Sequence, residues 1–198
     1  THLIPELVDS VFGKYKVGSI LNVIGNASPS KEVYAEVIRE LQEKSMELIG
    51  IPCLYGLDQI HGASYIDGAT FFPQEINQAA TFDRNFAFEA GRVCAYETRA
   101  AMVPWTFAPV MDLGRNPLWP RMWESYGEDT YLNAEMGKAS VAGLQGDCPS
   151  DVDSLHIAAC LKHYMAYGVP QTGQDRTCLL VTFDAAHEMR GVNCESVV

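Results

Sequence analysis

The chain has 198 residues, 47% of them hydrophobic and 20% charged, which is the composition of a globular domain rather than of a disordered or fibrous chain. Its formal net charge of -11 at pH 7 repels phosphate backbones and anionic lipids, so we expect neither nucleic acid nor a membrane as a partner. No apolar run has the ~20 residues of a membrane span, and the first residues lack a signal-peptide pattern. The 6 cysteines are too sparse for a disulfide scaffold and are expected to be mostly buried free thiols.

Strand and helix patterns alternate along the chain, which is typical of a parallel sheet with crossover helices. A first strand is expected within residues 17–24. Ser28 before Pro29 then predicts an N-cap and a first-turn proline for a helix that ends at Gly50. A second strand is expected over residues 51–57, followed by a long loop.

Aspartates mark the starts of two further predicted helices. Asp83 is expected to cap a helix over residues 85–102, and a third strand follows over residues 105–110. A second long loop leads to Asp129, the expected cap of a helix that ends at Gly146. The first of these two helices is expected to bury one side, formed by Phe86, Ala90 and Val93.

A fourth strand is expected over residues 156–165, which gives four strands and three helices in one domain. Both long loops follow strands, whereas the connections from helix to strand are short. This asymmetry suits a (β/α)₈ barrel, whose active site is built from the loops at one face. An open doubly wound sheet would place ligands similarly, so the periodicity leaves both folds open and the motifs must decide.

Six short motifs follow one another in the part of the chain between residues 17 and 177. In chain order they are residues 56–62 (GLDQIHG), 72–74 (FPQ), 107–112 (FAPVMD), 114–117 (GRNP), 121–129 (RMWESYGED) and 162–164 (KHY). Together they resemble the N-terminal barrel of a β-glucosidase of glycoside hydrolase family 3. The resemblance implies an α/β fold, part of a (β/α)₈ TIM-type barrel with about four β/α units.

The family resemblance also implies an activity, retaining hydrolysis of terminal non-reducing β-D-glucosyl or related β-glycosyl residues. The implied substrate is a β-glucoside or an oligosaccharide, and no cofactor is implied because the family uses carboxylates and water. Four residues match family positions that hydrogen-bond the sugar next to the scissile bond: Asp58, Arg121, Lys162 and His163. The sequence after His163 lacks the Pro-Gly-His-Gly loop of the N-acetylglucosaminidases, which favours the β-glucosidase branch.

The residue types are those that sugar binding requires. A carboxylate accepts hydrogen bonds from adjacent sugar hydroxyls, while Arg and Lys donate to them. Asp58 follows the second strand, where it could instead cap the turn. His61 either lines the pocket or is hydrogen-bonded within its own loop. Asp58 and His61 are also common metal-ligand types, but a third ligand at suitable spacing is missing, so no metal is expected.

The loop around Arg121 contains aromatic and carboxylate neighbours that can clamp a guanidinium towards a sugar, namely Trp119, Trp123 and Glu124. We expect Arg121 to bind the ligand and Arg115 to hold the loop. Lys162 and His163 are adjacent, and a regular strand would send them to opposite faces. A kink, bulge or non-proline cis peptide is therefore predicted between them, the alternative being one buried and one exposed side chain.

The two catalytic carboxylates of the family are not identifiable in the sequence. No Ser-Asp-Trp or Ser-Asp-Tyr motif follows the fourth strand, and the setting of Asp184 does not match the nucleophile. The resemblance ends near Thr177, so we predict a truncated barrel domain over residues 1–177 and a divergent tail over residues 178–198.

Two functions therefore stay open. In the first, the chain carries the sugar-binding part of a full-length hydrolase. In the second, it is an inactive half-barrel that binds sugar weakly or serves as a structural piece, completed by a missing C-terminal segment or another chain. Relatives of this type are commonly periplasmic or secreted, and that is the location we expect.

Overall fold

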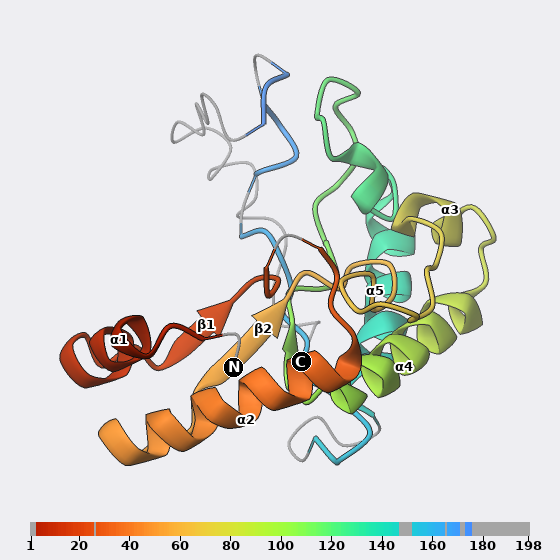
Figure 1. The fold of residues 1–198 in the computed structure, drawn as a ribbon. Coiled ribbons are helices and arrows are strands. Elements are labelled where there is room, and N and C mark those ends of the chain that lie inside the picture. Colours follow the sequence, from red (N-terminus) through yellow and green to blue (C-terminus); the bar gives the residue numbers. More distant parts are fainter. Residues whose placement is uncertain (1–2, 26, 147–151, 165, 171–172, 176–198) are drawn as a thin grey trace.

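The computed structural model describes residues 3–25, 27–146, 152–164, 166–170 and 173–175. Within these ranges three strands form a parallel sheet in the order β1-β2-β3 (Figure 1). The strands are β1 (Ser19–Leu21), β2 (Leu54–Leu57) and β3 (Trp105–Thr106). Parallel strands need crossover connections, and here these contain helices, as the predicted α/β class requires.

The helical elements of the same ranges fall into long crossover helices and short segments. They are α1 (Pro5–Val8), the π-helical η1 (Asp9–Lys14), α2 (Lys31–Leu48), α3 (Glu75–Ala79), α4 (Arg84–Ala100), the 3-10 turn η2 (Met122–Glu124) and α5 (Thr130–Gln145). The three long helices α2, α4 and α5 were predicted, whereas α1 and α3 are too short to leave a periodic pattern. Figure 1 shows α2 on one flank of the sheet and α4 and α5 side by side on the other.

The predicted aspartate caps of α4 and α5 are confirmed. The Asp83 side chain accepts a hydrogen bond from the Asn85 backbone N–H at 2.9 Å, and Asp129 accepts one from the Leu132 N–H at 2.7 Å. Each cap satisfies a backbone donor that the first helical turn leaves free. These two starts are local features, which is why the sequence locates them well.

The predicted start of α2 is wrong by two residues. Ser30, not Ser28, is the N-cap, and its extended backbone (φ -68°, ψ 162°) directly precedes Lys31. The Ser30 carbonyl accepts the first helical hydrogen bond, from the Tyr34 N–H at 3.1 Å. Pro29 consequently lies before the cap instead of in the first turn.

The predicted buried side of α4 is also partly wrong. Phe86 is 57% exposed, while the buried positions are mostly small residues: Ala87, Ala90, Gly91, Cys94, Ala95 and Thr98. The reason is the close approach of α5, because a Cβ on Gly91 would lie 2.6 Å from the Ser140 carbonyl oxygen. Small side chains therefore occupy the interface, and the bulky Phe86 is left outside it.

The largest hydrophobic cluster lies between α2, the sheet and the N-terminal helices. From α2 it contains Tyr34, Val37, Ile38 and Leu41, which pack with Tyr55 and Leu57 of β2 and with Phe12 of η1. Full burial of one such large apolar side chain contributes roughly 1.5–3 kcal/mol. This cluster fixes β2, the strand that carries Asp58 at its end.

All four predicted strands are shorter in the structure: the second, over residues 51–57, is reduced to β2, and the third, over residues 105–110, to β3. The first, expected over residues 17–24, is reduced to β1, and the fourth, over residues 156–165, is not a continuous strand. Its described part runs parallel to β3 with isolated bridges from Ala158 to Trp105 and from Lys162 to Val110. Between these bridges the pairing register changes, because the Cys160 N–H donates to the Ala108 carbonyl at 2.9 Å whereas the Lys162 N–H donates to the Pro109 carbonyl at 3.2 Å. No described helix is long and apolar enough to cross a membrane.

Candidate active site

The polar residues of the site come from segments that follow neighbouring strands. Asp58 follows β2, Arg121 and Asp112 lie in the loop after β3, and Lys162 and His163 follow the segment paired with β3. The structure brings all four predicted sugar ligands together. Lys162 Nζ donates to Asp58 Oδ1 at 2.5 Å, and Arg121 Nη1 lies 3.5 Å from His163 Nε2.

The ion pair of Asp58 and Lys162 joins residues far apart in the sequence. The Lys162 side chain is only 11% exposed, whereas Asp58 is 47% exposed, so the pair presents its carboxylate to solvent. An ammonium has three N–H donors, and pairing with one carboxylate oxygen leaves donor capacity for a ligand. Asp58 is thus not simply a turn cap.

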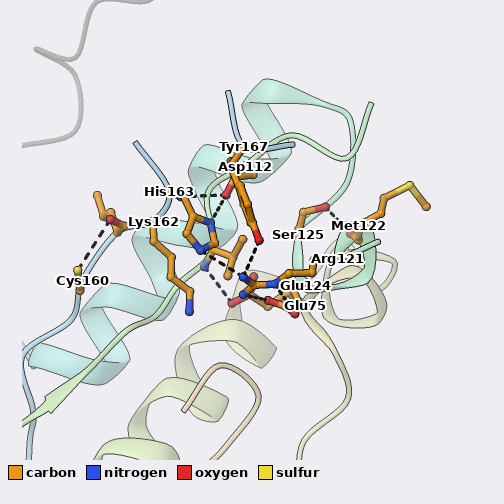
Figure 2. A network of polar contacts seen from close by, with 12 residues as sticks. Glu75, Asp112, Arg121, Met122, Glu124, Ser125, Cys160, Lys162, His163 and Tyr167 are labelled. Carbon is orange, nitrogen blue, oxygen red and sulfur yellow. Dashed lines mark hydrogen bonds and ion pairs between the residues drawn. The ribbon is translucent and has the colours of Figure 1, made fainter. Parts of the chain in front are cut away.

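Arg121 is held on two sides. Its Nε donates to Glu124 Oε1 at 2.8 Å and its Nη2 to Oε2 at 2.5 Å, which is a bidentate pair. These hydrogen bonds raise the pKa of the guanidinium further. The predicted carboxylate clamp is confirmed, but the aromatic partner is Tyr167, whose ring centroid lies 5.4 Å from Cζ (Figure 2).

His163 is anchored by a buried aspartate. Asp112 Oδ2 lies 2.8 Å from the ring Nδ1 and accepts the His163 backbone N–H at 2.9 Å (Figure 2). The ring packs against Tyr167 at a centroid distance of 4.3 Å. The peptide bond between Lys162 and His163 is cis, which confirms the predicted irregular backbone at this pair.

Three residues of the site were not singled out from the sequence: Glu75, Asp112 and Tyr167. Glu75 is 1% exposed and accepts the Val110 backbone N–H at 3.4 Å through Oε1. Its Oε2 has no hydrogen-bond partner in the described part of the chain, and burial raises the pKa of the carboxyl well above its usual value. The sequence signal was proximity, because Glu75 follows the FPQ motif and Asp112 ends the FAPVMD motif.

Two other residues, His61 and Arg115, stabilise loops through contacts with backbone carbonyl oxygens. His61 Nδ1 lies 2.9 Å from the Phe72 carbonyl oxygen, and its ring contacts Phe71 edge-on at 4.5 Å, which agrees with hydrogen bonding inside the loop. Arg115 Nε donates to the Glu128 carbonyl at 3.2 Å, in agreement with its expected structural role.

The described part of the chain offers no metal site, and its cysteines are free thiols. No described group of three or more His, Cys, Asp and Glu residues could hold a metal ion. Cys53 and Cys94 are buried free thiols and Cys160 is a half-buried one. The remaining cysteines, Cys148, Cys178 and Cys194, lie outside the described residues.

Comparison with known proteins decides the family. The sequence model described as the glycosyl hydrolase family 3 N terminal domain matches residues 5–188, which is most of the chain. The chain belongs to glycosyl hydrolase family 3. The matched range includes every residue of the site described above.

Relatives in family 3 include glucosidases and xylosidases. The chain is 39% identical to the lysosomal beta glucosidase of Dictyostelium discoideum, covering 82% of this chain and 21% of that protein. It is 33% identical to the periplasmic beta-glucosidase of Salmonella typhimurium, covering 86% and 20%. The chain therefore spans about a fifth of the length of these relatives.

Solved family 3 structures share the fold. A beta-glucosidase involved in saponin metabolism from intestinal bacteria aligns with a TM-score of 0.74 at 36% identity, covering 85% of this chain and 21% of that one. The exo-1,3/1,4-beta-glucanase of a Pseudoalteromonas species aligns at 0.77 and 31% identity, covering 85% and 22%. The predicted fold class is confirmed: the chain is an α/β part of a TIM-type barrel. The predicted domain boundary near Thr177 lies within residues 176–198, which are outside the described ranges, so it stays a prediction.

Proposed function

We propose that the site binds the terminal non-reducing β-D-glucosyl, or a related β-glycosyl, residue of a β-glucoside or oligosaccharide. Asp58, Arg121, Lys162 and His163 are the proposed ligands of its hydroxyls. The observation that carries the proposal is their convergence, in a family 3 chain, on the strand ends where barrel enzymes bind substrates.

The charge pattern supports a neutral polyhydroxyl ligand. The Asp58 carboxylate supplies acceptors, while the Lys162 ammonium and the Arg121 guanidinium supply donors. The fixed donors and acceptors also favour sugars that match them, because a wrong sugar leaves buried polar groups unpaired. Phosphate and other anions would be repelled by Asp58 and by the negative net charge of the chain.

In the full-length protein, the proposed activity is retaining hydrolysis of such β-glycosyl residues. The names of the glucosidase and xylosidase relatives support it. Retaining hydrolysis needs two carboxylates about 5–5.5 Å apart, and the family's nucleophile and acid/base are not identified in this chain. A periplasmic or secreted location is proposed because one relative is named periplasmic and another lysosomal.

The second candidate is sugar binding without turnover by this chain alone. It is favoured by the state of the described site carboxylates, because Asp58, Glu124 and Asp112 each pair with a basic side chain and Glu75 is buried. None of these four carboxylates is both exposed and free of a basic partner, as a nucleophile would be. A missing C-terminal segment or another chain would then supply the reaction.

A binding experiment tests the sugar site that both candidates share. Titration of the chain with D-glucose, followed by NMR, is expected to show binding that Asp58→Asn weakens by about tenfold or more. Asp67→Asn, an exposed aspartate in the same loop, is the matched control and should leave binding unchanged. Equal binding by both variants would refute the site.

Hydrolysis of p-nitrophenyl β-D-glucopyranoside by the same three proteins separates the candidates. Turnover that requires Asp58 would mean that this chain holds a working carboxylate pair. Glucose binding without turnover would support the second candidate.

A further inference from the structure

Asp112 uses one carboxylate oxygen to hold both the main chain and the ring of His163. Oδ2 accepts the backbone N–H at 2.9 Å and lies 2.8 Å from ring Nδ1. The Asp112 side chain is 3% exposed, and Asn133 of α5 donates to the Asp112 main-chain carbonyl at 3.3 Å. A side chain this buried is shielded from a ligand, so it can affect binding only through the residues that it contacts, and its side-chain contacts are to His163.

A second neighbour sits at the opposite nitrogen of the ring. Arg121 Nη1 lies 3.5 Å from His163 Nε2 (Figure 2). A guanidinium has only N–H donors, so it opposes a proton on Nε2 and favours a lone pair there. The carboxylate of Asp112 favours a proton on Nδ1. Both neighbours therefore select the same neutral tautomer of His163.

We propose that Asp112 is a positioning residue that keeps His163 in the Nδ1–H tautomer, so that a sugar hydroxyl replaces the long Arg121 contact and donates its hydrogen bond to Nε2. The ligand in this inference rests on the proposed function, whereas the tautomer does not. The site then offers two acceptors, Asp58 and His163, beside the donors of Lys162 and Arg121. It selects a sugar whose hydroxyl donates its O–H to His163, and it disfavours fluoro or methoxy sugars that cannot donate there.

The tautomer is measured first, in the 198-residue chain at ~pH 8, by long-range ¹H–¹⁵N correlation NMR. Comparison with His163→Gln identifies the signals of this ring. The expected pattern is a protonated Nδ1 and an unprotonated Nε2. A ring protonated only on Nε2 overturns the inference, whether or not any sugar binds and whether or not an Asp112 variant folds.

D-glucose binding tests the role of Asp112. Asp112→Asn keeps an oxygen that can accept the His163 backbone N–H, but it removes the carboxylate charge that favours a proton on Nδ1. It should therefore raise the population of the Nε2–H tautomer and weaken glucose binding by about tenfold. In His163→Gln the amide oxygen can accept near the Nε2 position without any tautomer to be set. Adding Asp112→Asn to that background should change binding by less than about twofold.

The outcomes are distinct. An equal loss from Asp112→Asn in both backgrounds would mean that Asp112 only supports the loop, which overturns the inference. If the wild-type chain binds no glucose, the proposed function fails, while the NMR spectrum still decides the tautomer. Folding of each variant is checked by the dispersion of its backbone amide spectrum.

Discussion

Glu75 is a buried carboxyl beside the ion pair of Arg121 and Glu124. Burial is the main cause that raises its pKa, and the nearby Glu124 carboxylate adds to it. The protonated form is therefore favoured in the folded chain. An uncharged carboxyl here keeps the site from accumulating a further buried negative charge beside Glu124 and Asp112.

This raised pKa predicts a pH dependence of stability. The folded chain holds the Glu75 proton more tightly than the unfolded chain, so the group's contribution is largest at low pH. That contribution declines as the pH rises from the unfolded pKa of ~4.3 towards the folded value. Glu75→Gln should thus lose less stability than the wild type between about pH 5 and about pH 7.

Urea unfolding at these two pH values measures the effect. Glu36→Gln, which removes an exposed carboxylate on α2, should follow the wild-type pH profile and serves as the control. Identical profiles for wild type and Glu75→Gln would mean that Glu75 is ionised in the folded chain.

Arg121→Lys tests the bidentate clamp. Lysine keeps the charge but cannot make two parallel N–H bonds to Glu124, so the donor aimed at the ligand loses its orientation. We expect glucose affinity to fall by about tenfold, with a small change in melting temperature. Arg115→Lys, at a residue that donates to a backbone carbonyl, should leave the affinity unchanged when both are measured by the same NMR titration.

The sequence predicted the four proposed ligand residues of the site better than the residues that support them. Asp58, Arg121, Lys162 and His163 lie in motifs that resemble a known family, so their positions could be transferred. The support from Asp112 could not be predicted, because it depends on a contact across 51 residues of sequence. Burial of this kind is set by tertiary packing, which no local pattern encodes.

At the scale of elements, the crossing of α4 and α5 depends on glycines. A Cβ on Gly143 would lie 2.1 Å from the Phe88 carbonyl oxygen and 2.8 Å from the Arg92 nitrogen, both rigid backbone atoms. The two helices would have to separate to admit a methyl group. Gly143→Ala is therefore expected to destabilise the chain by about 1–3 kcal/mol in urea unfolding.

Gly137→Ala in the same helix is the matched control. There the added Cβ would meet Met111 Cε and Sδ at 2.5 Å, but these atoms end a flexible side chain that can move. Helix propensity also favours alanine over glycine by up to about 1 kcal/mol. A loss for Gly137→Ala as large as that for Gly143→Ala would contradict the role assigned to the helix crossing.

Features that depend on a single helical turn were predicted better than features that depend on how elements pack together. The caps at Asp83 and Asp129 could be read directly, because an N-cap depends only on its own helical turn. The buried side of α4 was predicted partly wrongly, because the glycine-mediated approach of α5 decides which side faces inward. The fourth strand was predicted too long, because the register of its pairing changes at Ala108 and Pro109, and a change of register on the partner segment leaves no pattern in residues 156–165.

At the scale of the whole molecule, β1 is an edge strand of the described sheet. Beside it lies a groove of about 340 Å³ between the N-terminal helices, β1 and α2, and its lining includes Val8, Val11, Ile20 and Val37. On its rim Leu7 is 59% exposed and Leu21 is 60% exposed. The half-barrel predicted from the sequence implies an open sheet edge, because too few strands are present to close the barrel, but the sequence does not show which side chains form it.

The groove should bind an apolar dye in the folded chain. We expect 8-anilinonaphthalene-1-sulfonate to gain fluorescence with the wild type, because contiguous apolar surface of this kind is rare on monomeric proteins. Leu7→Asp places a charge on the rim and should lower the signal by about half or more. Phe86→Asp, on an equally exposed apolar residue of α4 that does not line the groove, should leave it unchanged. If both variants lower the fluorescence equally, the dye reports general surface apolarity, and the groove at β1 is not a distinct binding surface.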